Sequence, residues 1–275
     1  MVTPGNTRPP VHFDFGGQVA VITGGSRGIG RGIAEGFLAA GADVVVCGRS
    51  EVAGGELPSA VGDDGEVRRA VYVVADVRDP EQAASVISAA RQRFGRLDVL
   101  VNNAGGSPEA DAATVSPRFV SSIVTLNLLA PFYCGQAANG VMQSQAEGGS
   151  IVNIGSVSGI RPSPGAAAYG AAKAGLINLT QTLAVEWAPK VRVNCVTVGL
   201  VATEAGLAHY GGESGMARVA ATVPLGRFAT PKDLAGLCLF LSSPSVAGYV
   251  SGANLVAHGG GEMPAYLAAA GGAEG

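Results

Sequence analysis

The fold is decided by Val19-Ala20-Val21-Ile22-Thr23-Gly24-Gly25-Ser26-Arg27-Gly28-Ile29-Gly30, a β-branched run that leads into a glycine-rich turn. The spacing Gly-x-x-x-Gly-x-Gly is a variant of the dinucleotide fingerprint. Glycines let the backbone turn sharply and approach a diphosphate, while the following helix directs its free N–H groups at the charge. Because the chain contains 42 glycines, the turn is informative mainly through its position between a strand and a helix. The stretch predicts a nucleotide-binding βα unit.

More β-branched runs alternate with helical patterns along the chain. We predict strands at 19–23, 44–47, 71–75, 97–101, 150–154, 192–197 and 253–257, and helices at 28–40, 80–94, 117–146 and 166–188, with a weak, glycine-broken segment at 51–66. The strands are continuously apolar, which is typical of a parallel sheet covered on both faces. With right-handed crossovers this pattern predicts a doubly wound α/β fold: one Rossmann-like domain with about seven parallel strands and helices on both faces. Such sheets bind ligands beyond the carboxyl ends of their strands.

Composition limits the classes of function. The chain has 275 residues, 47% of them apolar and 14% charged, with a formal charge of −3. These values fit a well-buried globular domain and give no basic field for nucleic acid. No apolar run approaches the ~20 residues that cross a bilayer, so no membrane partner is expected. The cysteines lie far apart without metal-like spacing, so we expect small core residues in a cytoplasmic protein, and no metal site.

The two ends of the chain differ from its centre. Residues 1–16 contain adjacent prolines and no apolar signal core, and we assign them to an amino-terminal arm rather than a secretory leader. The catalytic domain is expected over 17–261. Residues 262–275 form an Ala- and Gly-rich tail.

The candidate site of chemistry is Tyr169-Gly-Ala-Ala-Lys173. The chain has only three lysines, and this one follows the tyrosine by four residues, on the same face of the predicted helix. A free phenol titrates near pH ~10, whereas a nearby cation favours the phenolate. Lowering the phenol pKa by about two to three pH units takes roughly 3–4 kcal/mol, which a desolvated ammonium can supply. Taken alone, the pair also fits an exposed helix with an incidental tyrosine and lysine.

The residues at the end of the second predicted strand indicate whether the nucleotide is NAD or NADP. NAD sites usually carry an acid about 20 residues beyond the glycine turn, whereas an arginine suits a 2′-phosphate. Here the strand ends in Gly48-Arg49-Ser50 without a carboxylate, and Arg27 of the glycine turn can close on the same phosphate. We therefore expect NADP(H), with NAD(H) as the alternative if both arginines are solvated surface charges.

Together these motifs resemble the short-chain dehydrogenase/reductase family over about residues 17–261. After the glycine turn come Asp76-Val77, Asn102-Asn103-Ala104-Gly105, then Ser156, and finally Tyr169 with Lys173, in the family's order. The resemblance implies a set of cofactor-binding residues: Gly24, Ser26, Arg27, Gly28, Ile29, Gly30, Arg49, Ser50, Asp76, Val77, Asn103, Ala104, Gly105, Ile154, Tyr169, Lys173, Gly199, Val201 and Thr203.

The resemblance also implies hydride transfer between nicotinamide C4 and a carbonyl or secondary-alcohol carbon. Tyr169 would exchange a proton with the substrate oxygen, and Lys173 would lower the tyrosine pKa and bind the nicotinamide ribose. Ser156 would donate a hydrogen bond to the oxygen as it gains charge. Asn127 matches the fourth catalytic residue, which holds a water in a proton relay. The alternatives are a loop-capping hydroxyl for Ser156 and a locally satisfied helix residue for Asn127.

Two positions depart from the family pattern. The expected Pro-Gly turn after the sixth strand is Val198-Gly199, which frees a backbone N–H and a φ angle. Cofactor affinity or loop mobility is therefore expected to differ. The carboxylate usual near the last strand is replaced by His258, for which we expect a structural or interfacial role.

The substrate region is less informative. Residues 204–226 match the family's substrate-covering segment, and their glycines favour a lid that orders on binding. Arg161-Pro162-Ser163-Pro164 should form one pocket wall. Since no charged cluster there demands a phosphate or carboxylate, we expect a mainly apolar ketone or secondary alcohol. The helices at 117–146 and 166–188 resemble surfaces through which relatives form dimers and tetramers, unless they cover the sheet of a monomer.

Three functions remain open at this stage. The first is NADPH-dependent ketone reduction or the reverse oxidation. The second is a non-catalytic nucleotide-binding regulator, against which the intact Ser156, Tyr169, Lys173 and Asn127 argue. The third is an isomerase or epimerase that retains its nucleotide.

Overall fold

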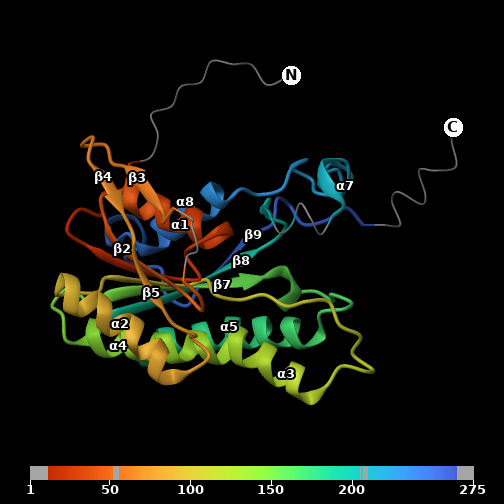
Figure 1. The fold of residues 1–275 in the computed structure, drawn as a ribbon, viewed down its shortest axis with the longest axis horizontal. Helices are drawn as coiled ribbons and strands as arrows, with labels where there is room; N and C mark the ends of the chain where they lie inside the picture. The colour runs from red at the N-terminus through yellow and green to blue at the C-terminus, as the bar shows by residue number, and fades with distance from the viewer. Residues whose placement is uncertain (1–11, 52–55, 205, 207–209, 265–275) are drawn as a thin grey trace, which may run out of the picture.

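The computed structural model describes residues 12–51, 56–204, 206 and 210–264. Within them, a seven-stranded sheet has the order β5-β2-β1-β6-β7-β8-β9, and every neighbouring pair is parallel (Figure 1). Its strands are β1 (Val19–Thr23), β2 (Asp43–Gly48), β5 (Val71–Val74), β6 (Val99–Asn102), β7 (Gly149–Ser156), β8 (Val191–Val198) and β9 (Asn254–Ala257). The predicted doubly wound, Rossmann-like fold is confirmed. Strand order reverses between β1 and β6, which places the ligand crevice beyond their carboxyl ends.

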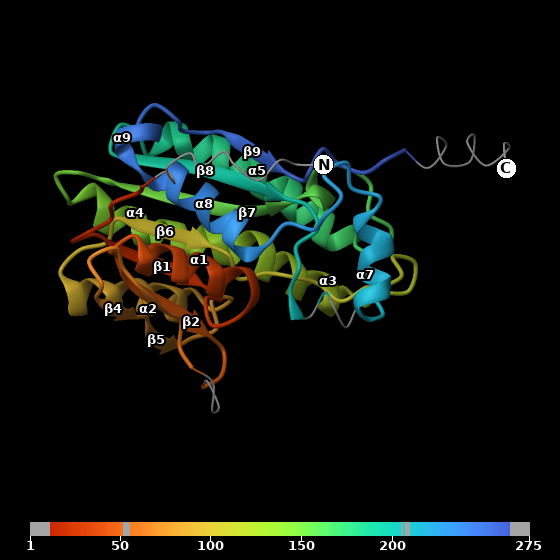
Figure 2. The ribbon, with the colours of Figure 1, turned by 90° about the horizontal axis from the view of Figure 1, so that it is seen from above.

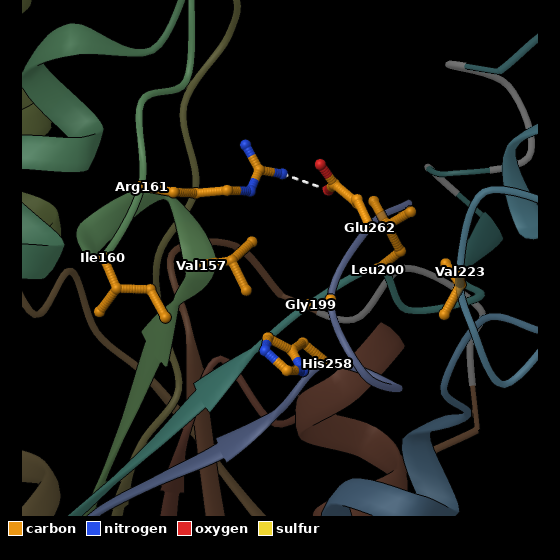
Figure 3. Close-up of a pocket in the computed structure, with 9 residues that line it drawn as sticks. Val157, Ile160, Arg161, Gly199, Leu200, Val223, His258 and Glu262 are labelled. Atoms are coloured by element: carbon orange, nitrogen blue, oxygen red, sulfur yellow. Dashed lines mark hydrogen bonds and ion pairs between the residues drawn. The ribbon is translucent and has the colours of Figure 1, made fainter. Parts of the chain in front are cut away.

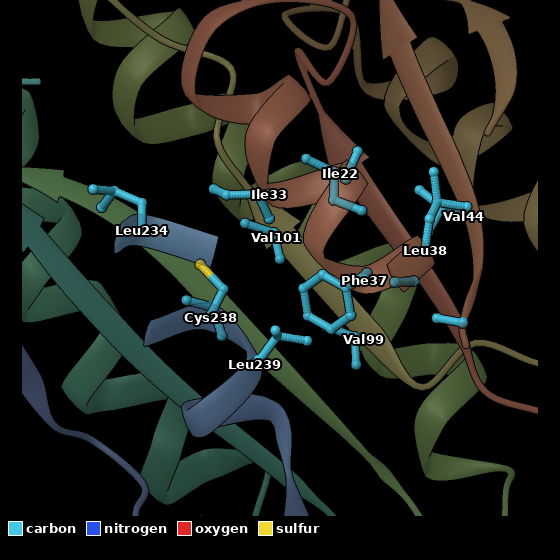
Figure 4. Packing of buried hydrophobic residues seen from close by; sticks show 14 of the residues in the cluster. Ile22, Ile33, Phe37, Leu38, Val44, Val99, Val101, Leu234, Cys238 and Leu239 are labelled. Atoms are coloured by element: carbon cyan, nitrogen blue, oxygen red, sulfur yellow. The ribbon is translucent and has the colours of Figure 1, made fainter. Parts of the chain in front are cut away.

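Helices form a layer on each face of the sheet. On one face α1 (Gly28–Ala39) packs against α8 (Pro231–Ser242), and on the other lie α2 (Pro80–Phe94), α4 (Ala130–Gln143) and α5 (Ala167–Glu186) (Figure 1). Under α1 and α8, Phe37 and Leu234 belong to the same buried cluster as Val99 and Val101 of β6 (Figure 4). The two apolar layers explain why the strands are apolar on both faces.

Helix α8 is absent from the sequence-based prediction, although its signal is present. Thr230 Oγ1 accepts a hydrogen bond from Asp233 N at 3.2 Å, and Asp233 Oδ2 accepts one from Thr230 N at 2.7 Å. Pro231 occupies the first turn, where its missing N–H leaves no bond unmade. This capping box fixes the start of the helix, and its apolar residues then complete the α1 layer.

The single helix predicted over 117–146 is wrong in detail. The chain forms α3 (Pro117–Val124), a π-helical turn η1 (Thr125–Leu129) and α4, which ends at Gln143. Among the described residues, the run Pro117–Gln143 is long and apolar enough to cross a membrane, by length and composition only. In this fold α4 packs against α2, β6 and β7, and α3 and η1 pack against α5, as in a layer that covers a sheet.

The glycine-broken segment also has more structure than predicted. Strands β3 (Ser59–Val61) and β4 (Val67–Arg69) form an antiparallel hairpin. Gly65 has a φ of +80°, which a residue with a side chain rarely adopts, and this conformation permits the tight connection. Residues 52–55 lie outside the described part of the chain.

The predicted arm meets the core at its inner end. The ring of Phe15 lies 5.1 Å from the ring of Phe37, edge to face, and Phe15 is only 1% exposed. Residues 1–11 and 265–275 lie outside the described residues, so the division into arm, domain and tail stays a prediction. The prediction that the cysteines are core residues is confirmed, since all four are buried: Cys47, Cys134, Cys195 and Cys238.

The carboxyl ends of the later strands face an additional helix. Helix α7 (Gly212–Ala220) lies beyond the ends of β7, β8 and β9 (Figure 2). It belongs to the predicted lid at 204–226, of which residues 205 and 207–209 are outside the described part. The crevice, the end of β7 at Ser156 and this helix therefore occupy the same end of the sheet.

Candidate active site

The glycine turn after β1 has the shape of a phosphate cradle. Gly24 and Gly28 have φ angles of +65° and +54°, in the left-handed region that favours glycine. A Cβ at Gly30 would lie 2.4 Å from the Gly24 carbonyl oxygen, so this position admits no side chain. Arg27 stands at the N-cap of α1 and makes no side-chain cap, which leaves the first N–H groups of the helix free for an anion. The predicted residues here fit a bound diphosphate.

The turn after β6 is tied to the glycine turn. The Thr23 hydroxyl accepts hydrogen bonds from Asn103 N and Ala104 N, both at 3.0 Å. The Asn103 side-chain nitrogen donates to the Thr23 carbonyl oxygen at 2.9 Å. Asn103 and Ala104 therefore lie beside the cradle, as the resemblance implied. Thr23 is not among the site residues predicted from the sequence. Its signal is a hydroxyl-bearing residue at the end of an otherwise apolar strand.

The end of β2 presents the residues expected at the adenosine ribose. Arg27, Arg49 and Ser50 lie at the surface, with both arginines exposed. The hydroxyl of Tyr72, on β5, donates to the Ser50 carbonyl oxygen at 2.5 Å. This bond fixes the backbone that carries Arg49. Tyr72 is a further residue that the sequence did not single out.

Asp76 follows β5 and is already paired. Its carboxylate accepts from the Arg78 guanidinium, with an N–O distance of 2.5 Å. The pKa of Asp76 is lowered, first by this hydrogen bond and least by the charge of Arg49. An adenine contact through Asp76 would thus share the carboxylate with Arg78. Val77 is buried behind it and contributes packing.

Ser156, Tyr169 and Lys173 converge at the end of β7. Ser156 is the last residue of the strand, Tyr169 lies in the first turn of α5, and Lys173 follows one turn later. The Ser156 side chain accepts a hydrogen bond from Ser158 N at 3.2 Å, and it lies close enough to the Tyr169 phenol to lower the pKa of that group. Lys173 Nζ lies 5.7 Å from the centre of the Tyr169 ring. The loop-capping contact of Ser156 is therefore present, and its hydrogen bond to a substrate oxygen stays a prediction.

Burial sets the protonation of this group. Lys173 is 3% exposed, and its Nζ donates to the Ile154 carbonyl oxygen at 2.7 Å. Its pKa falls to about 8 because burial penalises the ammonium. The pKa of Tyr169 is raised by burial, which outweighs the hydrogen bond from Ser156. The expectation that the cation would hold the tyrosine pKa below its ordinary value is therefore wrong.

Asn127 lies in the π-helical turn and is fully buried. Its side-chain oxygen accepts from Gly106 N at 2.9 Å, and its nitrogen donates to the carbonyl oxygens of Gly106 and Ile123. A Cβ at Gly105 would lie 2.8 Å from Asn127 Oδ1 and 3.3 Å from Lys173 Nζ, so all three residues adjoin. Because the side chain is occupied, a relay through Asn127 would use its backbone carbonyl.

The segment after β8 closes the other side of the crevice. Val198 ends β8 in register with Ser156 and Ala257, so the sheet itself holds the position that the family fills with proline. Gly199 N donates to the Ala257 carbonyl oxygen at 3.0 Å.

Beyond Gly199, the chain turns back over the glycine turn. Val201 forms a bridge with Ala229. A Cβ at Gly28 would lie 3.8 Å from Thr203 Cγ2. Of the predicted cofactor residues of this segment, Thr203 therefore lies beside the phosphate cradle.

A cavity of about 260 Å³ opens one residue beyond the ends of β7 and β8 (Figure 3). Val157 and Gly199, which follow Ser156 and Val198, are part of its wall, whereas Ser156 and Tyr169 are not. The remaining lining residues are Ile160, Arg161, Leu200, Val223, His258, Gly261 and Glu262. The predicted wall at Arg161 is present. This wall carries an ion pair between Arg161 and Glu262, which the sequence did not predict, whereas the expectation of a mainly apolar ketone or alcohol stays a prediction. His258 lines the cavity as well.

Comparison with known proteins identifies the family. Residues 24–262 match the family model described as Enoyl-(Acyl carrier protein) reductase. The chain is 41% identical over 250 residues to an uncharacterized oxidoreductase of Methylorubrum extorquens, covering 89% of this chain and 97% of that protein. A structure of a mutant Serratia marcescens short-chain dehydrogenase/reductase matches with a TM-score of 0.76 and 30% identity, over 90% of this chain and 98% of that one. The chain belongs to the short-chain dehydrogenase/reductase family.

Membership in the short-chain dehydrogenase/reductase family determines the reaction class. The chain is an NAD(P)-dependent oxidoreductase that acts on CH–OH or carbonyl groups. A 3-oxoacyl-[acyl-carrier-protein] reductase of Synechocystis is 35% identical over 246 residues, covering 88% of this chain and 96% of that protein.

Proposed function

We propose that this short-chain dehydrogenase/reductase reduces a small ketone to a secondary alcohol with NADPH. The observation that carries the proposal is the convergence of Ser156, Tyr169 and Lys173 beside a cavity at the carboxyl ends of β7 and β8. The bound cofactor supplies the hydride. The chain's own residues hold the ketone, polarise its oxygen and deliver a proton to it.

The protonation of Tyr169 favours reduction. Because burial raises its pKa, the phenol keeps its proton at neutral pH, which is the form needed to protonate a developing alkoxide. Ser156 lies beside the Tyr169 phenol, whose pKa it lowers, and it would donate a hydrogen bond to the same substrate oxygen. Lys173, fixed on the Ile154 carbonyl oxygen, would hold the nicotinamide ribose.

Two arginines support the preference for NADP(H). Arg27 in the glycine turn and Arg49 after β2 are exposed cations, and residues 48–50 contain no carboxylate to bind a free 2′-hydroxyl. A 2′-phosphate would gain charge-assisted hydrogen bonds from either guanidinium.

We also propose a homo-oligomer in the cytoplasm. Large apolar side chains are exposed at one edge of the sheet: Val185, near the end of α5, is 79% exposed, Tyr249 is fully exposed, and Val256 of β9 is 42% exposed. An exposed apolar group at a sheet edge is typical of an interaction surface. Light scattering after size exclusion should give a mass of two or four protomers, and a 27.3 kDa monomer would contradict the proposal.

A panel of ketones and secondary alcohols, each tested with reduced and oxidised NADP and NAD, tests the proposed reaction. Absorbance at 340 nm should fall with NADPH and a ketone, more slowly with NADH, and not at all with Tyr169→Phe. A retained nucleotide that copurifies without net change at 340 nm would favour an isomerase instead. A clear preference for NADH would refute the cofactor assignment.

A further inference from the structure

The cavity beyond β7 and β8 contains a cation in a mainly apolar wall. Arg161 lies five residues after Ser156, and its guanidinium donates to the carboxylate of Glu262, which comes from the segment after β9 (Figure 3). The two side chains are 39% and 40% exposed, which places the pair at the mouth of the cavity. His258 is the other titratable residue of the lining.

The two partners of this pair are held differently. Arg161 N donates to the Val157 carbonyl oxygen at 3.0 Å, and Arg161 Nη1 donates to the Pro162 carbonyl oxygen at 3.0 Å and to Ser163 Oγ at 3.2 Å. The guanidinium thus stays in place without Glu262. In the described part of the chain, Arg161 is the only polar partner of the Glu262 carboxylate. Arg161 is therefore held by three further hydrogen bonds, whereas the Glu262 carboxylate is held, among the described residues, by Arg161.

The segment that carries Glu262 is attached to the region after α7. Leu225 N donates to the Gly259 carbonyl oxygen at 3.0 Å, and Met263 N donates to the Thr222 carbonyl oxygen at 2.8 Å. Val223, between these two bonds, lines the cavity opposite Arg161 (Figure 3). Glu262 and Val223 therefore line the cavity on segments that are hydrogen-bonded to each other.

We propose that Arg161 binds a carboxylate of the substrate, and that Glu262 occupies the guanidinium until the substrate displaces it. An incoming carboxylate replaces one oxyanion by another and keeps the charge-assisted bond, whereas a neutral ketone gains nothing from Arg161. A substrate amine would find in this ion pair only the Glu262 carboxylate as a partner, and that carboxylate is already paired with the Arg161 guanidinium. The substrate class is therefore a keto acid with an apolar body against Val157, Ile160 and Leu200. This inference rests on the proposed ketone reduction.

Pairs of acid and ester substrates test whether Arg161 binds a carboxylate. The substrates are methyl-ketone acids of increasing chain length and their methyl esters, reduced with NADPH by wild type, Arg161→Met, Arg161→Lys and Glu262→Gln. The control variant is Arg227→Met, because the exposed ion pair of Arg227 with Asp233 lies outside the cavity. For at least one length, wild type should bind the acid with a KM about tenfold to a hundredfold below that of the ester.

Each variant has a distinct expected effect. Arg161→Met should raise the KM for the acid to that for the ester, while kcat/KM for the ester stays within about twofold of wild type. Arg161→Lys should restore part of the difference in KM between acid and ester. Glu262→Gln should lower the KM of the acid further because the competitor is gone. Arg227→Met should keep the wild-type preference.

Equal KM values for acid and ester in wild type would overturn the inference. An equal fall in kcat/KM for acid and ester in Arg161→Met would also overturn it, and so would a higher KM for the acid in Glu262→Gln than in wild type. In each case the ester is still reduced, so the proposed function stands. If no ketone is turned over, the proposed function fails, and calorimetry with pentanoate decides the inference alone. Binding to wild type that is lost in Arg161→Met supports it, and equal binding or no binding to both overturns it.

Discussion

Replacing Lys173 with methionine should stabilise the ligand-free protein at pH 7 while abolishing its activity. Lys173 is 3% exposed, and in the described residues its ammonium has no carboxylate partner: Nζ donates to the Ile154 carbonyl oxygen at 2.7 Å and lies 5.7 Å from the centre of the Tyr169 ring. Methionine has a similar length and no charge, so it can fill the same space. A catalytic residue held at a cost to stability is expected where function needs a buried charge.

The magnitude follows from the pKa. A fall from 10.5 to about 8 means that holding the proton costs about 3 kcal/mol more in the folded protein than in the unfolded chain. Methionine removes this penalty but also loses the bond to Ile154, worth about 1 kcal/mol. We expect a net gain of about 1–2 kcal/mol in the free energy of unfolding at pH 7.

The free energy of unfolding depends on pH because the folded and unfolded chains bind a different number of protons at Lys173. Between pH 8 and 10.5 the unfolded chain holds a proton that the folded protein has released, so wild type gains stability as the pH rises. The stability of Lys173→Met relative to wild type should therefore fall by about 2.5 kcal/mol between pH 7 and pH 10, so that wild type becomes the more stable protein at pH 10. The penalty is fully present below pH 8.

Urea unfolding followed by circular dichroism, at one fixed protomer concentration, measures both values. Lys190→Met is the control, because Lys190 is exposed and bonds the Gln143 and Gln145 carbonyl oxygens at 2.8 Å. It should give no gain at pH 7. The reasoning is refuted if Lys173→Met is less stable than wild type at pH 7, or if the difference between them is the same at pH 7 and pH 10.

Further predictions concern the chemistry, the cofactor and the packing of the site. Tyr169→Phe should lower kcat by orders of magnitude and leave the NADPH Kd, measured by fluorescence, within about twofold, so an active variant would contradict the proton-transfer role. Arg49→Ala should raise the KM for NADPH about tenfold to a hundredfold and barely change that for NADH, whereas equal effects would remove the 2′-phosphate argument. Gly105→Ala should destabilise the protein by about 1–3 kcal/mol, because its Cβ would lie 2.8 Å from Asn127 Oδ1. Gly140→Ala, with nothing within 4 Å in the interior of α4, should instead stabilise it by up to about 1 kcal/mol, and the same sign for both would show that the contact does not matter.

Local sequence patterns predicted the strands because apolar runs and glycine turns act over a few residues. Strand β1 and its turn were recognisable from adjacent positions. The break of the long helix at Thr125–Leu129 was not recognisable in this way: this turn contains Asn127, whose side chain bonds Gly106, 21 residues earlier in the chain. Helix α8 could have been found from Thr230 and Asp233 and was missed.

The sequence by itself determined the doubly wound sheet, the glycine cradle and the order of Ser156, Tyr169 and Lys173, because each depends on spacing along one or two neighbouring elements. Only the tertiary structure decided that Lys173 is buried with a pKa of about 8, that the pKa of Tyr169 is raised, and that Arg161 meets Glu262. Desolvation depends on everything packed around a group, and an ion pair across 101 residues depends on where β9 ends relative to β7. Neither quantity is encoded in the spacing of a motif.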